Sequence, residues 1–283
     1  MKPQFEKVVG VPLKYEMLAC NPWRQNLLLA ERYRERRVFL AGDAAHLVIP
    51  TGGLGMNTGV GDAIDLSWKL AATLAGWGGV RLLDSYEIER RQVGERNVGA
   101  SRYASLGRRK WRAEYRPGIG DDTPQGAATR ARLASVAEVE QRKTNEMIGA
   151  ELGYRYVDSP VICDIPGGPE HLFRSYQPST WPGARLPHVW LDDGTPMQDR
   201  IAYDGYTLLR LGSRNADTSA MVEGFGARSA PLTVLDIPDE AAREIYGFDL
   251  ILLRPDLHIV WRGNRPPENP RELAALATGN AGR

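Results

Sequence analysis

The sequence has few cysteines, no excess of charge of either sign and no long hydrophobic run. Its 283 residues include two cysteines, Cys20 and Cys163, which stand far apart and form no C-x-x-C pair. A disulfide framework, a zinc cluster and dithiol redox chemistry are therefore not expected. Lys and Arg number 36 and Asp and Glu 35, and this balance argues against nucleic acid or an anionic membrane surface as a partner.

Membrane and export signals are absent from the sequence as well. No run of about 18 consecutive apolar residues occurs, and residues 1–6 lack the apolar segment of a signal peptide. We therefore expect a cytoplasmic protein without a membrane span. The hydrophobic content of 42% is enough for a buried core in one large domain or two modest ones.

Several common site motifs are also missing. The spacing of Gly53, Gly55, Gly59 and Gly61 does not give the dinucleotide fingerprint G-x-G-x-x-G, and no Lys-Ser or Lys-Thr closes a phosphate loop. There is no G-x-S-x-G for a serine nucleophile, and the four histidines are too scattered to suggest a metal site. Hydrolase and metalloenzyme chemistry are therefore not expected.

The most informative segment runs from residue 37 to residue 74. An apolar strand over residues 38–41 leads into the turn Gly42-Asp43-Ala44-Ala45-His46. Asp43 then lies at the carboxyl edge of a strand, where α/β proteins bind ligands. Its carboxylate could meet a hydroxyl-rich ligand or merely cap the turn, and the sequence leaves both open. For His46 we expect a structural, hydrogen-bonded role rather than that of a general base.

A loop rich in glycine follows, and then a helix. The loop from Pro50 to Met56 lets the backbone approach a ligand closely, and a helix is predicted to begin near Asn57. The start of a helix carries unpaired N–H groups and a partial positive charge, which stabilise an anion. Apolar residues at helical spacing from Val60 to Leu74 predict that this helix buries that face.

The remaining pattern indicates an α/β protein. Short apolar runs between residues 13 and 38 suggest two paired strands, and Arg and Glu in residues 82–111 suggest a helix with a charged outer face. The sequence predicts one amphipathic helix over residues 127–152. Residues 154–182 are predicted to form a loop-rich connector. A small α/β unit follows, with strands expected at 188–191, 206–210, 231–235, 250–253 and 258–261 and a helix at 239–246.

Together these motifs resemble a known family. The tract R-V-F-L-A-G-D-A-A-H at 37–46, followed by P-x-x-G-x-G-x-N at 50–57, resembles the second FAD motif of the flavin-dependent aromatic hydroxylases of the p-hydroxybenzoate and phenol hydroxylase type. The tract S-Y-E-I-E-R-R at 85–91 resembles the family's following helix. Residues 182–262 look like the thioredoxin-like C-terminal domain of the phenol hydroxylase branch, although no redox cysteine pair is present.

The resemblance implies a fold, a domain organisation and a site. Residues 1–110 would form the C-terminal part of an FAD-binding, Rossmann-like domain, 111–181 a helical and loop connector, and 182–283 a thioredoxin-like α/β domain assigned to stability or subunit contact. It implies that Asp43 binds the ribityl chain and that Pro50 lies beside the reactive edge of the flavin. The pyrimidine end would meet Gly55, Met56 and Asn57, and the turn and loop glycines Gly42 and Gly53 belong to the same cofactor site.

The implied activity is an FAD-dependent, NAD(P)H-using hydroxylation of an aromatic, phenolic substrate by molecular oxygen, through a flavin hydroperoxide. Homo-oligomer formation is compatible with the resemblance. The family's G-x-G-x-x-G and its Asp-Gly motif are absent, so the resemblance covers only the later half of such an enzyme. Two alternatives stay open: a non-catalytic fragment that associates through the thioredoxin-like domain, and an epoxidase or polyketide-tailoring oxygenase with the same cofactor.

Overall fold

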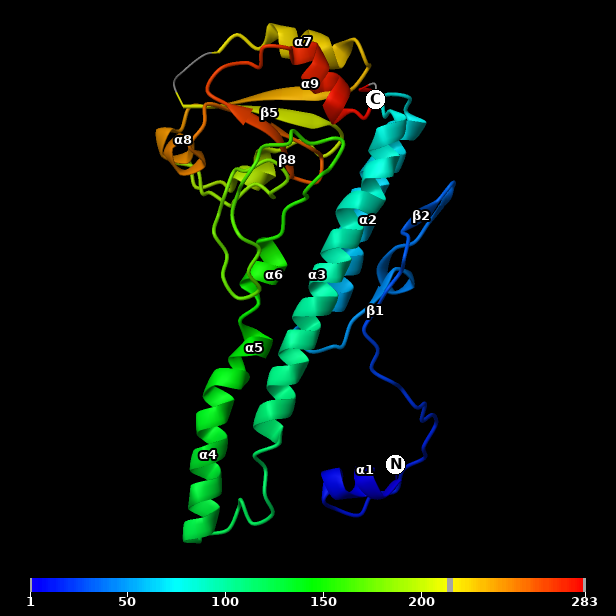
Figure 1. Ribbon diagram of the computed structural model, residues 1–283, viewed down its shortest axis with the longest axis vertical. Coiled ribbons are helices and arrows are strands. Elements are labelled where there is room, and N and C mark those ends of the chain that lie inside the picture. Colours follow the sequence, from blue (N-terminus) through cyan, green and yellow to red (C-terminus); the bar gives the residue numbers. More distant parts are fainter. Residues whose placement is uncertain (1, 213–215, 282–283) are drawn as a thin grey trace.

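The computed structural model describes residues 2–212 and 216–281, and combines long helices with a small mixed sheet (Figure 1). Helix α2 (Leu54–Leu74) packs along helix α3 (Val80–Arg112). One end of this pair meets the C-terminal sheet, whereas helix α4 (Pro124–Glu140) packs near the other end of α3 (Figure 1). Within the described ranges no helix is both long and apolar enough to cross a membrane.

The N-terminal region contains only short strands. Strand β1 pairs antiparallel with β4, and β2 pairs antiparallel with β3. The two strands expected before residue 38 therefore exist, but they pair with later strands and not with each other. The strand expected over residues 38–41 is limited to two residues, because its hairpin partner is equally short. The bounds are α1 (Lys2–Val9), β1 (Leu28–Leu29), β2 (Arg34–Glu35), β3 (Val38–Phe39), the 3₁₀ turn η1 (Gly42–Ala44) and β4 (His46–Leu47).

Helix α2 differs from its expected form in two ways. It begins at Leu54, before the expected start near Asn57, because Gly53 adopts a left-handed conformation (φ 68°) that ends the loop directly before it. Its orientation also contradicts the prediction. The apolar residues from Val60 to Leu74 that were expected to be buried are mostly exposed, whereas Asp62, Asp65 and Lys69 are buried.

Helix α3 confirms the helix expected over residues 82–111, but its charged residues are not all on an outer face. Glu89 and Arg90 are buried, since both make ion pairs within the protein. The single helix expected over 127–152 is divided into α4, α5 (Arg142–Asn145) and α6 (Ile148–Leu152). The chain bends between α5 and α6, where Met147 enters a buried cluster with residues of α2 and α3.

The C-terminal unit is a four-stranded sheet in the order β6-β5-β7-β8. The pair β5–β6 is parallel and is connected through α7, whereas β5–β7 and β7–β8 are antiparallel. Four of the five expected strands are confirmed, as is the helix at 239–246; the strand expected at 188–191 is reduced to a single bridge between Trp190 and Pro196. The bounds are η2 (Met197–Arg200), β5 (Tyr206–Leu211), α7 (Ser219–Gly226), β6 (Leu232–Ile237), α8 (Glu240–Tyr246), β7 (Leu250–Leu253), β8 (Ile259–Gly263) and α9 (Pro270–Ala277).

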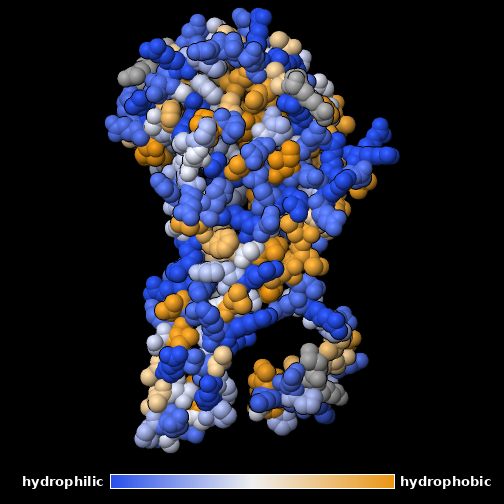
Figure 2. Space-filling model, viewed as in Figure 1, coloured by the Kyte–Doolittle hydropathy of each residue, from blue (hydrophilic) through white to orange (hydrophobic). Residues whose placement is uncertain are grey.

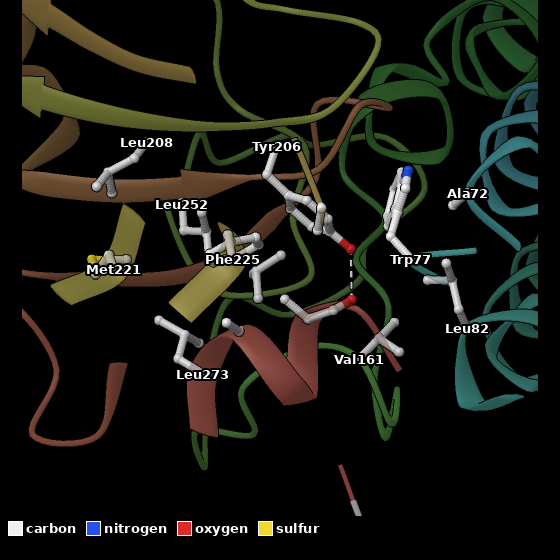
Figure 3. Packing of buried hydrophobic residues seen from close by; sticks show 14 of the residues in the cluster. Ala72, Trp77, Leu82, Val161, Tyr206, Leu208, Met221, Phe225, Leu252 and Leu273 are labelled. Atoms are coloured by element: carbon white, nitrogen blue, oxygen red, sulfur yellow. Dashed lines mark hydrogen bonds between the residues drawn. The ribbon is translucent and has the colours of Figure 1, made fainter. Parts of the chain in front are cut away.

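One hydrophobic core joins the C-terminal sheet to the long helices. Figure 3 shows Tyr206 of β5 between Phe225 of α7 and Trp77, which follows α2. The Tyr206 hydroxyl donates to the carbonyl oxygen of Ala277 at 2.6 Å, so its polar end is satisfied inside the core. Ala72 of α2 and Leu82 of α3 belong to the same cluster. The C-terminal sheet therefore holds α2 and α3 by direct packing.

Candidate cofactor site

Asp43 is held in an exposed turn next to helix α2. Turn η1 packs against α2, and the residue that precedes it, Ala41 at the N-cap, makes no side-chain hydrogen bond. The Asp43 side chain is exposed and makes no hydrogen bond or ion pair to any described residue. The hypothesis that Asp43 caps its own turn is therefore wrong. Its carboxylate is available to accept hydrogen bonds from a ligand.

Two glycines allow the turn to lie directly on the helix. Gly42 adopts a left-handed conformation (φ 61°), and a Cβ atom added to Gly59 of α2 would lie 3.1 Å from the Gly42 Cα atom. Such an approach is tighter than most real Cβ contacts, so a side chain at position 59 would push the turn away. This contact places Asp43 beside the first two turns of α2.

The beginning of α2 has no side-chain cap. Its N-cap residue is Gly53, which makes no side-chain hydrogen bond, and no acidic residue occurs in the first turn. The first N–H groups of a helix have no intrahelical acceptor, so those of Leu54, Gly55 and Met56 remain available for an anion. Met56 is 78% exposed, and Asn57 donates from Nδ2 to the Gly53 carbonyl oxygen at 3.0 Å.

The loop that carries Pro50 is anchored on both sides. Ser101 of α3 donates its hydroxyl to the carbonyl oxygen of Ile49 at 2.7 Å, and the side chains of Ile49 and Thr51 are buried. Pro50 between them is exposed. A Cβ atom at Gly55 would lie 2.9 Å from a Val48 methyl group, so the loop also packs closely on the helix start.

The structure thus brings the expected residues together at one end of α2. The turn containing Gly42 and Asp43 lies against the helix, and the loop from Pro50 to Gly53 leads straight into its first turn. The Asp43 turn, which contacts Gly59, and the free N–H groups of the first turn therefore both lie at the N-terminal part of α2. This arrangement can hold a hydroxyl-rich chain at Asp43 and a negatively charged ring at the helix start.

A buried carboxylate that was not among the expected site residues supports the turn. Asp62 of α2 accepts a hydrogen bond from the Gly42 backbone N–H at 2.9 Å and lies 2.8 Å from His46 Nε2. Arg90 of α3 donates from Nε to the second Asp62 oxygen at 2.8 Å. Burial opposes ionisation of Asp62, but the His46 hydrogen bond and the Arg90 charge outweigh it and lower its pKa. An ionised carboxylate only accepts, so His46 donates to it.

This network confirms the structural role expected for His46, which is 1% exposed. Arg90 also donates to the Thr58 carbonyl oxygen and to the Tyr156 hydroxyl, both at 3.1 Å. The Arg90 guanidinium therefore joins both long helices and the connector directly, and it reaches the turn through Asp62. The signal in the sequence is that Asp62, Asp65 and Lys69 recur at helical spacing, so the charged residues of this helix share one face.

A second buried cluster joins α2 and α3 to the C-terminal sheet. Arg254, which follows β7, donates to Glu89 at 2.6 Å and to Asp65 at 2.9 Å, and it also pairs with Asp256. Lys69 donates to Asp65 at 2.7 Å and to Glu89 at 2.6 Å. Each of these side chains is at most 3% exposed. Three carboxylates against two cations leave one excess negative charge in a buried position.

The pKa values in this cluster move apart. Burial raises the pKa of Asp65 to about 7, and the neighbouring Glu89 adds to the rise although Lys69 and Arg254 oppose it. For Glu89, burial is outweighed by the charges of Arg254 and Lys69, which lower its pKa to about 2. Asp65 is therefore the carboxyl that takes up the proton when the excess charge is neutralised.

Together, the mixed helix and sheet fold and the helix-start site define an α/β protein of the flavoprotein class. Comparison with known families agrees: residues 5–101 match the model of an FAD binding domain, and residues 179–283 match the aromatic-ring hydroxylase C-terminal domain. The chain belongs to the family of FAD-dependent aromatic hydroxylases.

Relatives include named monooxygenases. An FAD-dependent monooxygenase of Emericella nidulans, apdD, is 38% identical over 93% of this chain and 44% of its own length. Phenol 2-monooxygenase of a Pseudomonas species is 31% identical over 93% of this chain and 48% of its own length.

Solved structures show the same similarity. The rebeccamycin biosynthetic enzyme RebC with reduced flavin superimposes with a TM-score of 0.88 at 34% identity, over 99% of this chain and 52% of that chain. The flavin-dependent monooxygenase PieE in complex with FAD and substrate gives a TM-score of 0.77 at 29% identity, over 92% and 50%. The chain thus spans about half the length of the relatives it matches.

Proposed function

We propose that this chain supplies the flavin-ring side of an FAD-dependent monooxygenase that hydroxylates an aromatic substrate. The observation that carries the proposal is the uncapped start of α2 beside the unpartnered carboxylate of Asp43. The membership of the chain in the aromatic hydroxylase family supports it. The residues present suit the flavin and ribityl parts of FAD, whereas the sequence contains no G-x-G-x-x-G for the diphosphate.

Each residue of the site receives a role in this proposal. Asp43 accepts hydrogen bonds from hydroxyls of the ribityl chain, and the left-handed backbone of Gly42 and Gly53 shapes the turn and the loop around it. The N–H groups of Gly55 and Met56 stabilise negative charge at the pyrimidine end of the ring. In the loop before the helix, Pro50 stands beside the reactive edge.

When bound, FAD would supply the redox chemistry of a monooxygenase, in which a hydride from NAD(P)H is the reductant, one atom of molecular oxygen enters an electron-rich ring and the other leaves as water. The protein residues hold and orient it. Asn57 fixes the loop by donating to the Gly53 carbonyl, and Ser101 fixes the loop on the other side of Pro50. The Asp43 turn is kept against α2 by the buried Asp62, which accepts from the Gly42 N–H. Asp62 is held in turn by His46 and Arg90.

A phenol is the substrate class that the phenol 2-monooxygenase similarity favours. A polycyclic aromatic substrate is the second candidate, and the similarity to a putative polyketide hydroxylase of Streptomyces halstedii, at 32% identity, favours it. The two are separated by measuring which ring system stimulates NAD(P)H consumption.

The test is a hybrid in which this chain replaces the matched region of the Emericella nidulans monooxygenase. We expect the purified hybrid to be yellow, with flavin absorbance near ~450 nm. The Asp43→Asn hybrid should bind FAD about tenfold to a hundredfold more weakly, because hydrogen bonds to a charged group contribute about 1.5–3 kcal/mol. Flavin fluorescence titration measures the dissociation constant.

The matched control is Asp122→Asn, since Asp122 is exposed in the loop before α4 and away from the site. Its hybrid should bind FAD as the unchanged hybrid does. A colourless hybrid that is nevertheless folded by circular dichroism, or equal losses for Asp43→Asn and Asp122→Asn, contradicts the proposal.

A further inference from the structure

Charge is unevenly distributed along this chain, although its total is close to neutral. Residues 102–132 contain eight arginines and lysines but only three aspartates and glutamates, whereas residues 186–283 contain ten basic and fourteen acidic residues. The first range covers the end of α3, the loop that follows and the first half of α4. We call it the basic arm. The chain therefore carries two regions of opposite net charge.

The basic arm extends away from the C-terminal sheet (Figure 1). Leu82, near the start of α3, packs in the core that includes the sheet, and Arg102 lies 20 residues further along the same helix. A helix rises about 1.5 Å per residue, so the arm begins roughly 30 Å from that core. Figure 2 shows hydrophilic residues over much of the surface at this end of the molecule. The C-terminal unit of the same chain therefore does not cover the arm.

Most of the positive charge of the arm has no counter-charge within the chain. All eight basic residues are exposed. In the described part of the chain, Lys110 and Arg132 pair with carboxylates, whereas no ion pair is made by Arg102, Arg108, Arg109 or Arg112. These four side chains recur at intervals of seven and four residues, so they lie on neighbouring rows of one side of α3. Their mutual repulsion favours contact with a negatively charged surface.

The C-terminal unit carries a surface of the complementary kind. Trp190 is 66% exposed and Tyr203 is 62% exposed. Both are connected to Gln198: the Tyr203 hydroxyl donates to its carbonyl oxygen at 3.2 Å, and the His188 ring, which contacts Trp190, lies 2.8 Å from its side-chain oxygen. Four exposed carboxylates lie in the same segment, those of Asp192, Asp193, Asp199 and Asp204. We call these carboxylates, with Trp190 and Tyr203, the acidic aromatic patch.

The negative charge of this patch is largely uncompensated. Arg200 is the only arginine or lysine among residues 190–204, and it pairs with Asp193. Arginine suits such a surface, because its guanidinium group pairs with carboxylates and also stacks on aromatic rings. Arg, Trp and Tyr are also the residues that contribute most to protein–protein contacts. The patch therefore offers an arginine-rich partner both charge and aromatic surface.

We propose that the basic arm of one copy of this chain docks on the acidic aromatic patch of a second copy. Two copies arranged antiparallel make this contact twice, which closes the assembly as a dimer. A second copy suits the arm better than nucleic acid does, because Glu114, Asp121 and Asp122 lie within the arm and would repel a continuous row of phosphates. The inference does not depend on flavin binding.

The first test uses the unchanged chain in sedimentation equilibrium. We expect it to self-associate at ~0.05 M salt, and its dissociation constant to rise at least tenfold at ~0.5 M salt, because salt screens contacts between exposed charges. A chain that stays monomeric at low salt, or that associates more tightly as salt is added, overturns the proposal. A monomeric chain that retards a DNA fragment assigns the arm to nucleic acid and also overturns it.

The second test reverses the charges of each surface separately. One variant carries Arg102→Glu and Arg109→Glu in the arm, and the other carries Asp199→Arg and Asp204→Arg in the patch. Each variant alone should associate at least tenfold more weakly, because like charges then face each other. An equimolar mixture of the two should associate again, since the reversed arm of one variant fits the reversed patch of the other. A mixture that stays monomeric overturns the proposal.

The matched control carries Arg24→Glu and Arg37→Glu, which change the net charge by the same amount as the arm variant. Both arginines are exposed and lie outside the arm and the patch. The control should keep the dissociation constant within twofold of that of the unchanged chain. Circular dichroism establishes that all three variants are folded. Equal weakening by the control and the arm variant would show that net charge, and not the arm, governs association.

Discussion

At the scale of single residues, the site depends on an unusually close backbone contact. Gly42 and Gly59 come from different elements, and their contact sets the position of Asp43 relative to α2. Helix propensity alone would favour alanine at position 59, because alanine stabilises a helix interior by about 1 kcal/mol relative to glycine. The close approach of the turn reverses that preference.

We therefore expect Gly59→Ala to destabilise the protein, because the new methyl group would lie 3.1 Å from Gly42 Cα. The control is Gly99→Ala in the interior of α3, where the nearest atom to a new Cβ would be Phe173 Cζ at an ordinary 3.6 Å. That control should stabilise by up to about 1 kcal/mol. Urea unfolding measures both, and a gain in stability for Gly59→Ala would contradict the packing argument.

Asp62 has a different role at the same scale. Its side chain is fully buried between the turn and α3. Its hydrogen-bond partners are Gly42, His46 and Arg90. A buried carboxylate is tolerated only when its oxygens are fully hydrogen-bonded, and here both are. It keeps the turn in place while leaving Asp43 free.

At the scale of elements, Arg254 connects the end of β7 to both long helices. Its guanidinium pairs with Asp65 of α2 and Glu89 of α3, so it holds the C-terminal sheet on the pair of helices. Removing it leaves carboxylates buried without their cation. The C-terminal unit therefore orients α2 as well as adding to the core.

We expect Arg254→Met to lower the free energy of unfolding by about 3–5 kcal/mol, as is typical when one partner of a buried ion pair is removed. The control is Arg210→Met, because the Arg210–Asp236 pair on β5 and β6 is partly exposed. It should cost less than about 1 kcal/mol. Thermal and urea unfolding compare the two; equal costs would show that Arg254 does not clamp the sheet to the helices.

At the scale of the whole molecule, the buried cluster makes stability depend on pH. The pKa of Asp65 is raised to about 7 in the folded protein, mainly by burial, from an ordinary value of 3.8. The cations Lys69 and Arg254 and the carboxylates Glu89 and Asp256 surround it, with His258 next to Asp256. The folded state therefore binds the Asp65 proton more tightly than the unfolded chain does.

The stabilisation from this proton is fully present below pH ~4 and is lost as the pH rises through about 7. We expect the stability of the unchanged protein to fall relative to Asp65→Asn over this range, by an amount on the order of a few kcal/mol. Urea unfolding of both proteins at several pH values between ~4.5 and ~8 measures the difference. A difference that stays constant or grows in the opposite direction contradicts the assignment of the proton to Asp65.

Much of the local structure could be predicted from sequence because it depends on neighbours along the chain. The helical spacing of residues 82–111 and the apolar runs at 206–210 and 250–253 produced the observed elements. Left-handed glycines in the loop also follow from local chemistry, although α2 begins at Leu54 and not near Asn57 as predicted. The candidate residues from Gly42 to Asn57 lie together for the same reason, since they are close in sequence.

Orientation and burial could not be predicted in this way. Periodicity shows that α2 has an apolar face, but either face can be buried. In this fold Asp62, Asp65 and Lys69 are buried because Arg90, Glu89 and Arg254, which are distant in sequence, supply the opposite charges. The sequence alone determined most of the elements and where the candidate cofactor turn lies. The tertiary structure decided which side of α2 faces inward, because ion pairing between distant segments is a property of the folded chain.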